Sequence, residues 1–185
     1  MAGSPSLESY IEQGIRARRS IDINQVEELA AKLHLAIQHG GKLITFGNGG
    51  SAADAQHFVG ELDGHFTKER GALPAICLST NTSSMTAIGN DYSYEDVFYR
   101  PLSALCNKDD IVVGISTSGN SRNVLKAVEE ANRKGAYTVG LTGRSGGKLA
   151  QIVRMAVRID SDFTPVIQEA HITFIHMVCL ALDNM

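Results

Sequence analysis

The chain has 185 residues, 43% of them hydrophobic, and its formal net charge is −3 at pH 7. This length suits a single globular domain spanning residues 1–185, which would bury roughly two-thirds of the surface that the unfolded chain exposes. The weak negative charge gives no electrostatic reason to expect a nucleic-acid partner. The three cysteines form no CxxC pair, and their odd number argues against a disulfide framework and for a reducing compartment.

The N-terminal part of the chain, residues 1–40, is expected to be a helical part of the same domain, with helices near Leu7–Arg19 and Gln25–His39. Charged side chains are scattered through residues 1–24, so this segment lacks the continuous apolar stretch of a signal peptide. No stretch of the sequence approaches the roughly 20 apolar residues that span a bilayer. The expectation is a cytoplasmic protein without a membrane partner.

Short apolar stretches alternate with amphipathic ones from residue 42 onward, which is typical of an α/β fold with helices covering a parallel sheet. Thr164 and Pro165 suit the start of the last helix, as its cap and as a residue of its first turn. Five strands are predicted, at Lys42–Phe46, Pro74–Ser79, Asp110–Ser116, Tyr137–Thr142 and Met155–Ile159. Helices are predicted between and after them, at Ser51–Asp63, Tyr94–Cys106, Ser121–Arg133, Gly147–Ile152 and Pro165–Leu182.

Two predicted loops have the composition of a phosphate site. Ligands of open parallel sheets bind where the carboxyl ends of the strands lead into loops, and Gly47–Ser51 and Ser116–Ser121 are such loops. The second offers four hydroxyl groups in six residues and precedes a helix, whose N-terminal amides and dipole favour an anion. In the alternative, Ser121 only caps that helix. The density of hydroxyl groups favours the phosphate interpretation.

The first loop also satisfies the loose dinucleotide-binding pattern Gly-x-Gly-x-x-Ala. That pattern expects an acidic residue at the end of the next strand to hold a ribose hydroxyl, and residues 71–90 contain no Asp or Glu. The lysine-containing phosphate loop of nucleotide hydrolases is also missing from residues 143–148. A sugar phosphate is therefore favoured over a nucleotide.

Two predicted helices carry candidate metal ligands. His57 and Glu61 stand four residues apart, so their side chains share one helix face and could chelate a divalent cation, although such a pair is more often an ordinary surface pair. Gln168, His171 and His176 lie in a strongly apolar helix, where polar groups need partners. His171 is expected to find its partner in the core or in a subunit interface. Gln168 and His176 are separated by roughly 12 Å of helix and could share a small ligand only with side chains that reach toward each other.

The sequence contains five segments that, taken together and in this order, resemble the sedoheptulose 7-phosphate isomerases, or phosphoheptose isomerases, of the sugar-isomerase (SIS) domain family. The resemblance covers nearly the whole chain. The segments are GNGGSAADAQHFVGEL (Gly47–Leu62), LPAICLSTNTSSMTAIGND (Leu73–Asp91), GISTSGNSRNVLKA (Gly114–Ala127), GLTGRSGGKLA (Gly140–Ala150) and TPVIQEAH (Thr164–His171).

This resemblance implies a doubly wound, flavodoxin-like sheet and a homotetramer with active sites at subunit interfaces. It implies conversion of sedoheptulose 7-phosphate to D-glycero-D-manno-heptose 7-phosphate, for nucleotide-activated heptose, through a zinc-stabilised enediolate. The implied ligands of one zinc ion per subunit are His57, Glu61, Gln168 and His176. The implied substrate-binding residues are Asn48, Gly49, Gly50, Ser51, Glu61, Asn90, Asp91, Ser116, Thr117, Ser118, Ser121 and Gln168.

The isomerisation moves a proton between adjacent carbons, so the site needs a base, a proton shuttle between oxygens and a group that stabilises negative charge. Glu61 is the candidate base, His176 the candidate shuttle and zinc the Lewis acid. A metal-bound carboxylate is a poorer base, so the two roles of Glu61 could compete. The phosphate loop would supply binding energy remote from the reacting carbons.

Two positions depart from the pattern of many relatives: His65 and Val166 stand where arginine is frequent. A charged contact with the substrate is therefore lost or replaced, and the identity of the sugar stays open. A rival interpretation is a non-catalytic tetrameric scaffold, as in the related replication-initiator-associating protein of bacteria. That relative lacks the residues aligned with Glu61 and His176, and this chain has both. A third interpretation, an isomerase or etherase for another sugar phosphate, keeps the loops but does not require the four candidate ligands.

Overall fold

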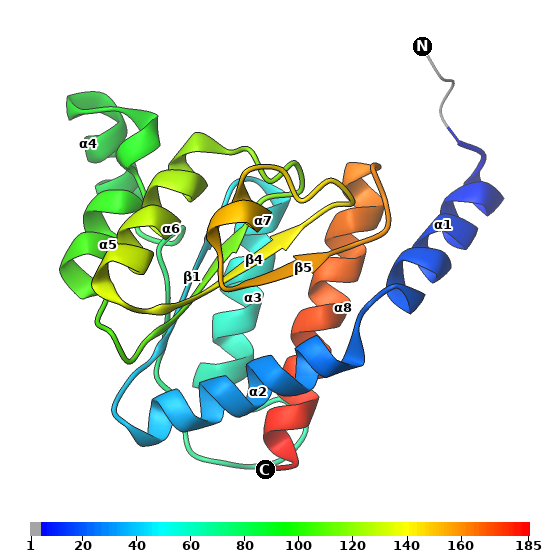
Figure 1. Cartoon of the computed structure of the whole chain (residues 1–185), viewed down its shortest axis with the longest axis horizontal. Coiled ribbons are helices and arrows are strands. Elements are labelled where there is room, and N and C mark those ends of the chain that lie inside the picture. The colour runs from blue at the N-terminus through cyan, green and yellow to red at the C-terminus, as the bar shows by residue number, and fades with distance from the viewer. Residues whose placement is uncertain (1–4) are drawn as a thin grey trace.

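The computed structural model describes residues 5–185, so the first four residues of the predicted domain lie outside the described part. Its centre is a five-stranded, all-parallel sheet in the order β2-β1-β3-β4-β5, flanked by helices (Figure 1). The predicted α/β fold is therefore confirmed. The single-domain organisation stays a prediction. The strands are β1 (Leu43–Gly47), β2 (Ala75–Cys77), β3 (Ile111–Ile115), β4 (Tyr137–Thr142) and β5 (Met155–Arg158).

Helices cover both faces of the sheet, as in a doubly wound fold. Alternate strand residues enter two separate cores, with Leu43 in one and Ile44 in the other. The first core is shared by α1 (Leu7–Arg19), α2 (Ile23–Gln38), α3 (Gly50–Asp63) and α8 (Thr164–Asp183). The second face carries α4 (Thr82–Asp91), the 3₁₀ turn η1 (Tyr94–Asp96), α5 (Tyr99–Leu105), α6 (Arg122–Lys134) and α7 (Leu149–Ile152).

The sheet order brings the two predicted phosphate loops together. β1 and β3 are neighbours, and the last residue of β1, Gly47, is in register with the last residue of β3, Ile115. The loops that follow them, residues 47–51 and 116–121, therefore leave the same edge of the sheet side by side. From β1 the chain passes to β2 on one side of the sheet, and from β3 it passes to β4 and β5 on the other. Open α/β sheets bind ligands at such a reversal of strand order, at the carboxyl ends of the strands.

The expectation that no stretch is long and apolar enough to cross a membrane was wrong for helix α8, which passes by length and composition and is the only such helix in residues 5–185. Half of its apolar window is buried, and the helix contacts α1, α2 and α3. Phe174, Ile175 and Val178 on this helix are fully buried in the first core. The apolar residues of α8 therefore pack in the core of this fold, where α8 is the central helix.

Two predictions on the second face were wrong. The predicted helices did not include the segment of α4, whose Ser, Thr, Gly and Asn residues have low helix propensity. Asn81 nevertheless caps it, accepting a hydrogen bond from the Ser84 N–H at 2.9 Å. The helix predicted at Tyr94–Cys106 is interrupted between η1 and α5, since the ring of Pro101 would clash with the carbonyl of Val97 in a continuous helix.

Two helix starts also differ from prediction. α7 begins at Leu149 and not at Gly147, because Gly147 has a φ of +54°, outside the helical region. α8 begins at Thr164, so Phe163 and not Thr164 is its cap, and no side chain bonds to the helix there. Pro165 lies in the first turn as predicted, where its missing N–H removes no helical hydrogen bond.

Candidate active site

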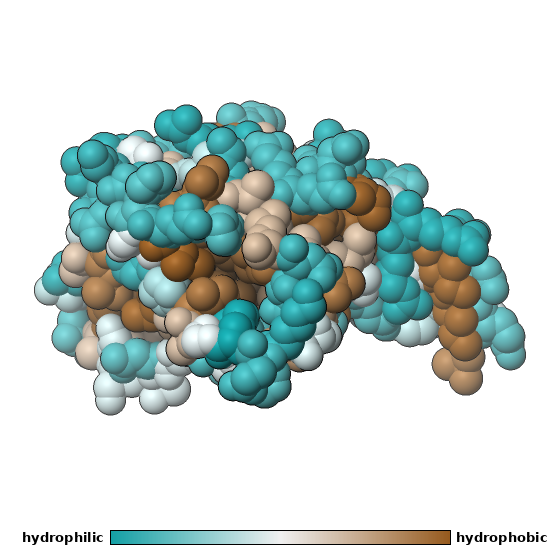
Figure 2. Space-filling view, turned by 90° about the horizontal axis from the view of Figure 1, so that it is seen from below, coloured by the Kyte–Doolittle hydropathy of each residue, from teal (hydrophilic) through white to brown (hydrophobic). Residues whose placement is uncertain are grey.

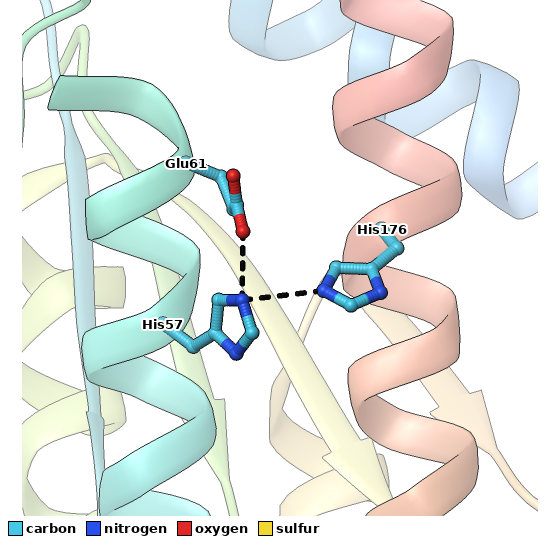
Figure 3. A group of neighbouring side chains, drawn as sticks. All are labelled: His57, Glu61 and His176. Atoms are coloured by element: carbon cyan, nitrogen blue, oxygen red, sulfur yellow. Dashed lines mark hydrogen bonds and ion pairs between the residues drawn. The ribbon is translucent and has the colours of Figure 1, made fainter. Parts of the chain in front are cut away.

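Three side chains converge in the seam between α3 and α8. His57 and Glu61 extend from α3 and His176 extends from α8 toward them (Figure 3). Nε2 of His57 lies 2.7 Å from Oε1 of Glu61 and 3.3 Å from Nε2 of His176. One donor atom from each residue lies within 4.8 Å of the others. We call these three residues the trio.

The donor set of the trio fits a divalent cation. Two imidazole nitrogens and a carboxylate oxygen are ligands that zinc accepts. Ligands about 2.0–2.1 Å from a tetrahedral ion lie roughly 3.3 Å apart, which matches the separation of the two imidazole nitrogens. His57 is exposed and the other two are half-buried, so the trio is open to solvent on one side. The prediction that His57 and Glu61 share one face of their helix is confirmed.

Gln168, the fourth predicted ligand, lies elsewhere in the same seam. Its amide packs against the start of α3, where a Cβ atom on Gly50 would be only 2.5 Å from its Nε2. Gly50 is seven residues before His57, or about 10 Å along the helix. Gln168 is therefore not part of the trio in this structure, and its role as a ligand stays a prediction. The absence of a side chain at Gly50 is what allows Gln168 to approach α3.

Asp54 is a feature of the seam that the sequence interpretation missed. It shares a face of α3 with His57 and Glu61, and its Oδ2 is buried with no hydrogen-bond partner in residues 5–185. Burial raises the pKa of Asp54 to about 6, although the charge of His57 acts in the opposite direction. The helical spacing of Asp54, His57 and Glu61 was the signal available in the sequence.

His171 is buried in the core, as expected, and its Nε2 bonds the carbonyl oxygen of Thr142 at 3.1 Å. Its Nδ1 is buried and has no partner in the described chain. Burial lowers the pKa of His171 from 6.5 to about 4, and the bond to Thr142 opposes this shift. The ring is therefore neutral at pH 7 and plays a structural part behind the seam.

Acid should destabilise the protein through His171. The unfolded chain binds this proton near pH 6.5 and the folded chain near pH 4, so the free energy of unfolding falls as the pH drops through this window, by about 3 kcal/mol. Asp54, with a raised pKa, acts in the opposite direction, because its contribution is lost as the pH rises from 3.8 to about 6. The test compares two metal-free variants, Asp54→Asn and the double variant Asp54→Asn/His171→Gln, by urea titration at several pH values. As the pH falls from 6.5 to 4, the free energy of unfolding should drop more steeply in the single variant, which keeps His171. Parallel slopes would contradict this account.

The second phosphate loop is arranged around its hydroxyl groups. Oγ of Ser116 lies 2.9 Å from Oγ of Ser121 and 3.5 Å from Oγ of Ser118. Ser121 occupies the cap position of α6, but its side chain makes no capping hydrogen bond. The first amides of α6 therefore receive no side-chain cap from Ser121, which favours the anion site over the simple cap. Thr117 is half-buried and Ser118 exposed in the same loop.

The backbone of this loop has little freedom to move. Gly119 has a φ of +65°, and a Cβ atom there would lie 2.0 Å from the carbonyl oxygen of Gly146. The Thr117 carbonyl also accepts a hydrogen bond from the Gly143 N–H at 2.9 Å. The hydroxyl groups are thus presented from a fixed main chain.

The first loop leads directly into α3. Gly49, with a φ of +55°, is the cap of α3 and supplies no side chain to its first amides. Ser51 is buried in the first turn, while Gly49 and Gly50 are exposed. Asn48 is half-buried and bonds to Asn123 on α6 and to Tyr94. The loop therefore presents main-chain N–H groups beside the hydroxyl groups of the second loop.

Asn90 and Asp91, also predicted to bind substrate, are the last two residues of α4. Both are exposed, and the Asn90 amide donates to the Asp91 carboxylate at 2.8 Å. No hydrogen bond joins them to either phosphate loop within residues 5–185. Of the two departures from the family pattern, Val166 is fully buried in the first core, whereas His65 is exposed beside Glu69.

Known proteins resemble this chain over most of its length. The SIS domain family matches residues 9–143. A probable phosphoheptose isomerase of Thermoplasma volcanium is 57% identical over 178 residues, which cover 96% of this chain and 91% of the relative. The phosphoheptose isomerase of Geotalea daltonii is 48% identical over 181 residues, covering 96% and 94%.

A solved structure gives the same result. The phosphoheptose isomerase GmhA of Neisseria gonorrhoeae superposes with a TM-score of 0.90 at 38% identity, and the match covers 97% of each chain. The similarity therefore extends over the sheet, both phosphate loops and the α3–α8 seam. The chain belongs to the SIS domain family and, within it, to the phosphoheptose isomerases.

Proposed function

We propose that the protein interconverts sedoheptulose 7-phosphate and D-glycero-D-manno-heptose 7-phosphate and so supplies a precursor of nucleotide-activated heptose. The observation that carries this proposal is the trio, in which a carboxylate and two imidazoles converge between α8 and α3, the helix that follows the first phosphate loop. Relatives named phosphoheptose isomerase support the same substrate. A non-catalytic scaffold would not need the carboxylate and the two imidazoles of the trio to converge.

Glu61 is proposed as the base that takes the proton from carbon. Its Oε1 faces His57, and no hydrogen bond from the described residues engages its Oε2. One oxygen could therefore face the metal while the other accepts the proton, which removes part of the conflict between the two roles. The proton would then return to the adjacent carbon of the enediolate, since a ketose and its aldose differ in which carbon carries the hydrogen.

His176 is proposed as the shuttle that moves a proton between the two substrate oxygens. Its ring packs against two others, that of His57 at a centroid distance of 4.9 Å and that of Phe66 at 5.4 Å. These contacts hold the imidazole in one orientation within the seam. A bound zinc ion would supply Lewis acidity, which stabilises negative charge on the substrate oxygens.

Zinc is the proposed metal because its ligands are typically nitrogen and oxygen atoms of this kind. His57, Glu61 and His176 would hold it, together with Gln168 once its amide turns away from Gly50. The phosphate of the substrate is assigned to the loops and to α6. The residues proposed to meet the sugar phosphate are Asn48, Gly49, Gly50, Ser51, Asn90, Asp91, Ser116, Thr117, Ser118, Ser121 and Gln168.

Substitution of Ser116 by alanine should weaken phosphate binding. Ser116 is buried and its hydroxyl lies within hydrogen-bond reach of Ser121, so its loss should cost about 1–3 kcal/mol, or roughly a fivefold to 150-fold rise in KM. Ser103→Ala is a matched control, because that hydroxyl bonds only a backbone carbonyl within α5. Steady-state kinetics of both variants would contradict the assignment if Ser116→Ala kept the parental KM.

A homotetramer in the cytoplasm with active sites at its interfaces is also proposed. Exposed apolar side chains lie along α1, which projects from the body, and across the surface near α2 and the end of α8 (Figure 2). They include Leu7, Ile11, Ile23, Leu35 and Leu180. Burial of such surface favours association of copies. Light scattering that gives a monomer mass at micromolar concentration would contradict the tetramer.

The isomerase proposal is tested by incubating the zinc-loaded protein with sedoheptulose 7-phosphate and recording carbon-13 NMR spectra. An anomeric aldose signal should appear and grow until the two sugars reach equilibrium. If the heptulose remains unchanged, the specific substrate is wrong, and other five- to seven-carbon sugar phosphates should be screened in the same assay. Lack of turnover with all of them would favour the scaffold interpretation.

A further inference from the structure

Two asparagine side chains join the first phosphate loop to the helix that follows the second. Asn48 follows β1, and Asn123 lies in the first turn of α6. Nδ2 of each asparagine donates to Oδ1 of the other, and both distances are 2.9 Å. Asn123 is only 4% exposed, whereas Asn48 is half-buried. The pair is thus a cross-link between the two loops, anchored on its Asn123 side in the protein interior.

The hydrogen-bonding capacity of this pair is almost fully used. Oδ1 of Asn123 also accepts from the Val124 N–H at 3.0 Å, and Oδ1 of Asn48 also accepts from the Tyr94 hydroxyl at 3.2 Å. Each carbonyl oxygen therefore has two donors, as many as its lone pairs accept. Each Nδ2 uses one of its two hydrogens within the pair. The second hydrogen of the more exposed amide, Asn48, is left for another acceptor.

Tyr94 is itself held in place from α6. It begins η1, and the next two residues of that turn form ion pairs with α6, Glu95 with Arg122 at 3.0 Å and Asp96 with Lys126 at 2.6 Å. These ion pairs hold the turn in the position from which the Tyr94 hydroxyl donates to Asn48. Asn48, Tyr94 and Asn123 form one unit, which we call the amide clamp.

We infer that Asn123 is a positioning residue for sugar-phosphate binding, an inference that rests on the proposed function. It acts through Asn48, because it sets the orientation of that carboxamide and leaves one N–H free toward the anion. It also fixes the backbone of residues 47–51 relative to that of residues 116–121. One phosphate can then contact the amides of the first loop and the hydroxyl groups of the second at the same time.

The clamp requires a carboxamide at position 123. Only an amide both donates to Asn48 and accepts from it, so an aspartate of the same shape keeps one of the two bonds and breaks the other. The aspartate also adds a negative charge beside the proposed anion. Asn123→Asp is therefore a sharp test of the inference, since it changes chemistry with little change in volume.

The experiment compares Asn123→Asp with Asn132→Asp by steady-state kinetics on sedoheptulose 7-phosphate and by calorimetric titration with inorganic phosphate. Asn132 lies on the same helix nine residues further along, where its Nδ2 donates to the backbone carbonyl of Ile152 at 2.7 Å and its Oδ1 accepts from the Thr138 hydroxyl at 2.8 Å. Asn123→Asp should raise KM and the phosphate Kd tenfold to hundredfold while kcat changes less than about threefold. Asn132→Asp should leave KM and the phosphate Kd unchanged.

A second arm tests whether Asn123 acts through Asn48. Asn48→Ala and Asn123→Ala should each raise the phosphate Kd. The Kd of the double variant should lie within about twofold of the higher of the two single-variant values, since the effects of residues that act as one unit are not additive. If the two increases in Kd multiply in the double variant, Asn123 does not act through Asn48. The inference is overturned if Asn123→Asp has the same KM and phosphate Kd as the unmodified protein. It is also overturned if the unmodified protein does not bind phosphate. If phosphate binds but the heptulose is not turned over, the proposed substrate is wrong and the inference about Asn123 still stands.

Discussion

Replacing Glu61 with glutamine should lower kcat by about a thousandfold or more. Glutamine preserves the shape of the side chain but cannot accept a proton from carbon at neutral pH, and general base catalysis contributes typically 10²- to 10⁴-fold. Asp63→Asn is the matched control, since this acid is exposed at the end of the same helix, two residues beyond Glu61. Kinetics by carbon-13 NMR should show near-parental turnover for the control.

The same variant separates the two roles proposed for Glu61. If it is mainly the base, Glu61→Gln should retain most of its metal while turnover is lost, because an amide oxygen remains beside His57 and His176. If it is mainly a ligand, metal content and turnover should fall together. Elemental analysis of the purified variant distinguishes these results. Turnover within tenfold of the unmodified protein would contradict both roles.

Removing the metal should have the second largest effect. The purified protein should contain about one divalent ion per chain, and dialysis against a chelator should lower turnover by about a hundredfold or more until zinc is returned. His57→Gln should weaken zinc binding in a competition titration by about tenfold or more. His39→Gln is the control, because that exposed residue is the C-terminal cap of α2 and lies outside the trio. A metal-free protein with undiminished turnover would contradict the proposal.

The fold was predictable because its signals are local. Buried parallel strands consist of continuous Ile, Val and Leu stretches, and α1 was predicted with its observed limits, Leu7–Arg19. α4 was missed because its composition favours a loop, while one cap at Asn81 and contacts with neighbouring elements favour a helix. Local propensity was overridden there by tertiary contacts.

The site was predictable only in part, because its decisive contacts join residues far apart in sequence. Four-residue spacing on one helix brought His57 and Glu61 together, but the approach of His176, 119 residues away, depends on how α8 packs against α3. The position of Gln168 beside Gly50 depends on the same packing. Nothing in the spacing of Asn48 and Asn123 indicated that their amides would pair across 75 residues. Such contacts follow from sheet order and helix packing.

The position of the metal tests the central claim most directly. Crystals of the protein purified with zinc should be measured on both sides of the zinc absorption edge, and an anomalous difference map should be calculated. We expect one peak per chain, within bonding distance of Nε2 of His57, the carboxylate of Glu61 and Nε2 of His176. A zinc peak elsewhere in the chain, or no peak from protein that turns over sedoheptulose 7-phosphate, would contradict the assignment of the trio as the catalytic metal centre.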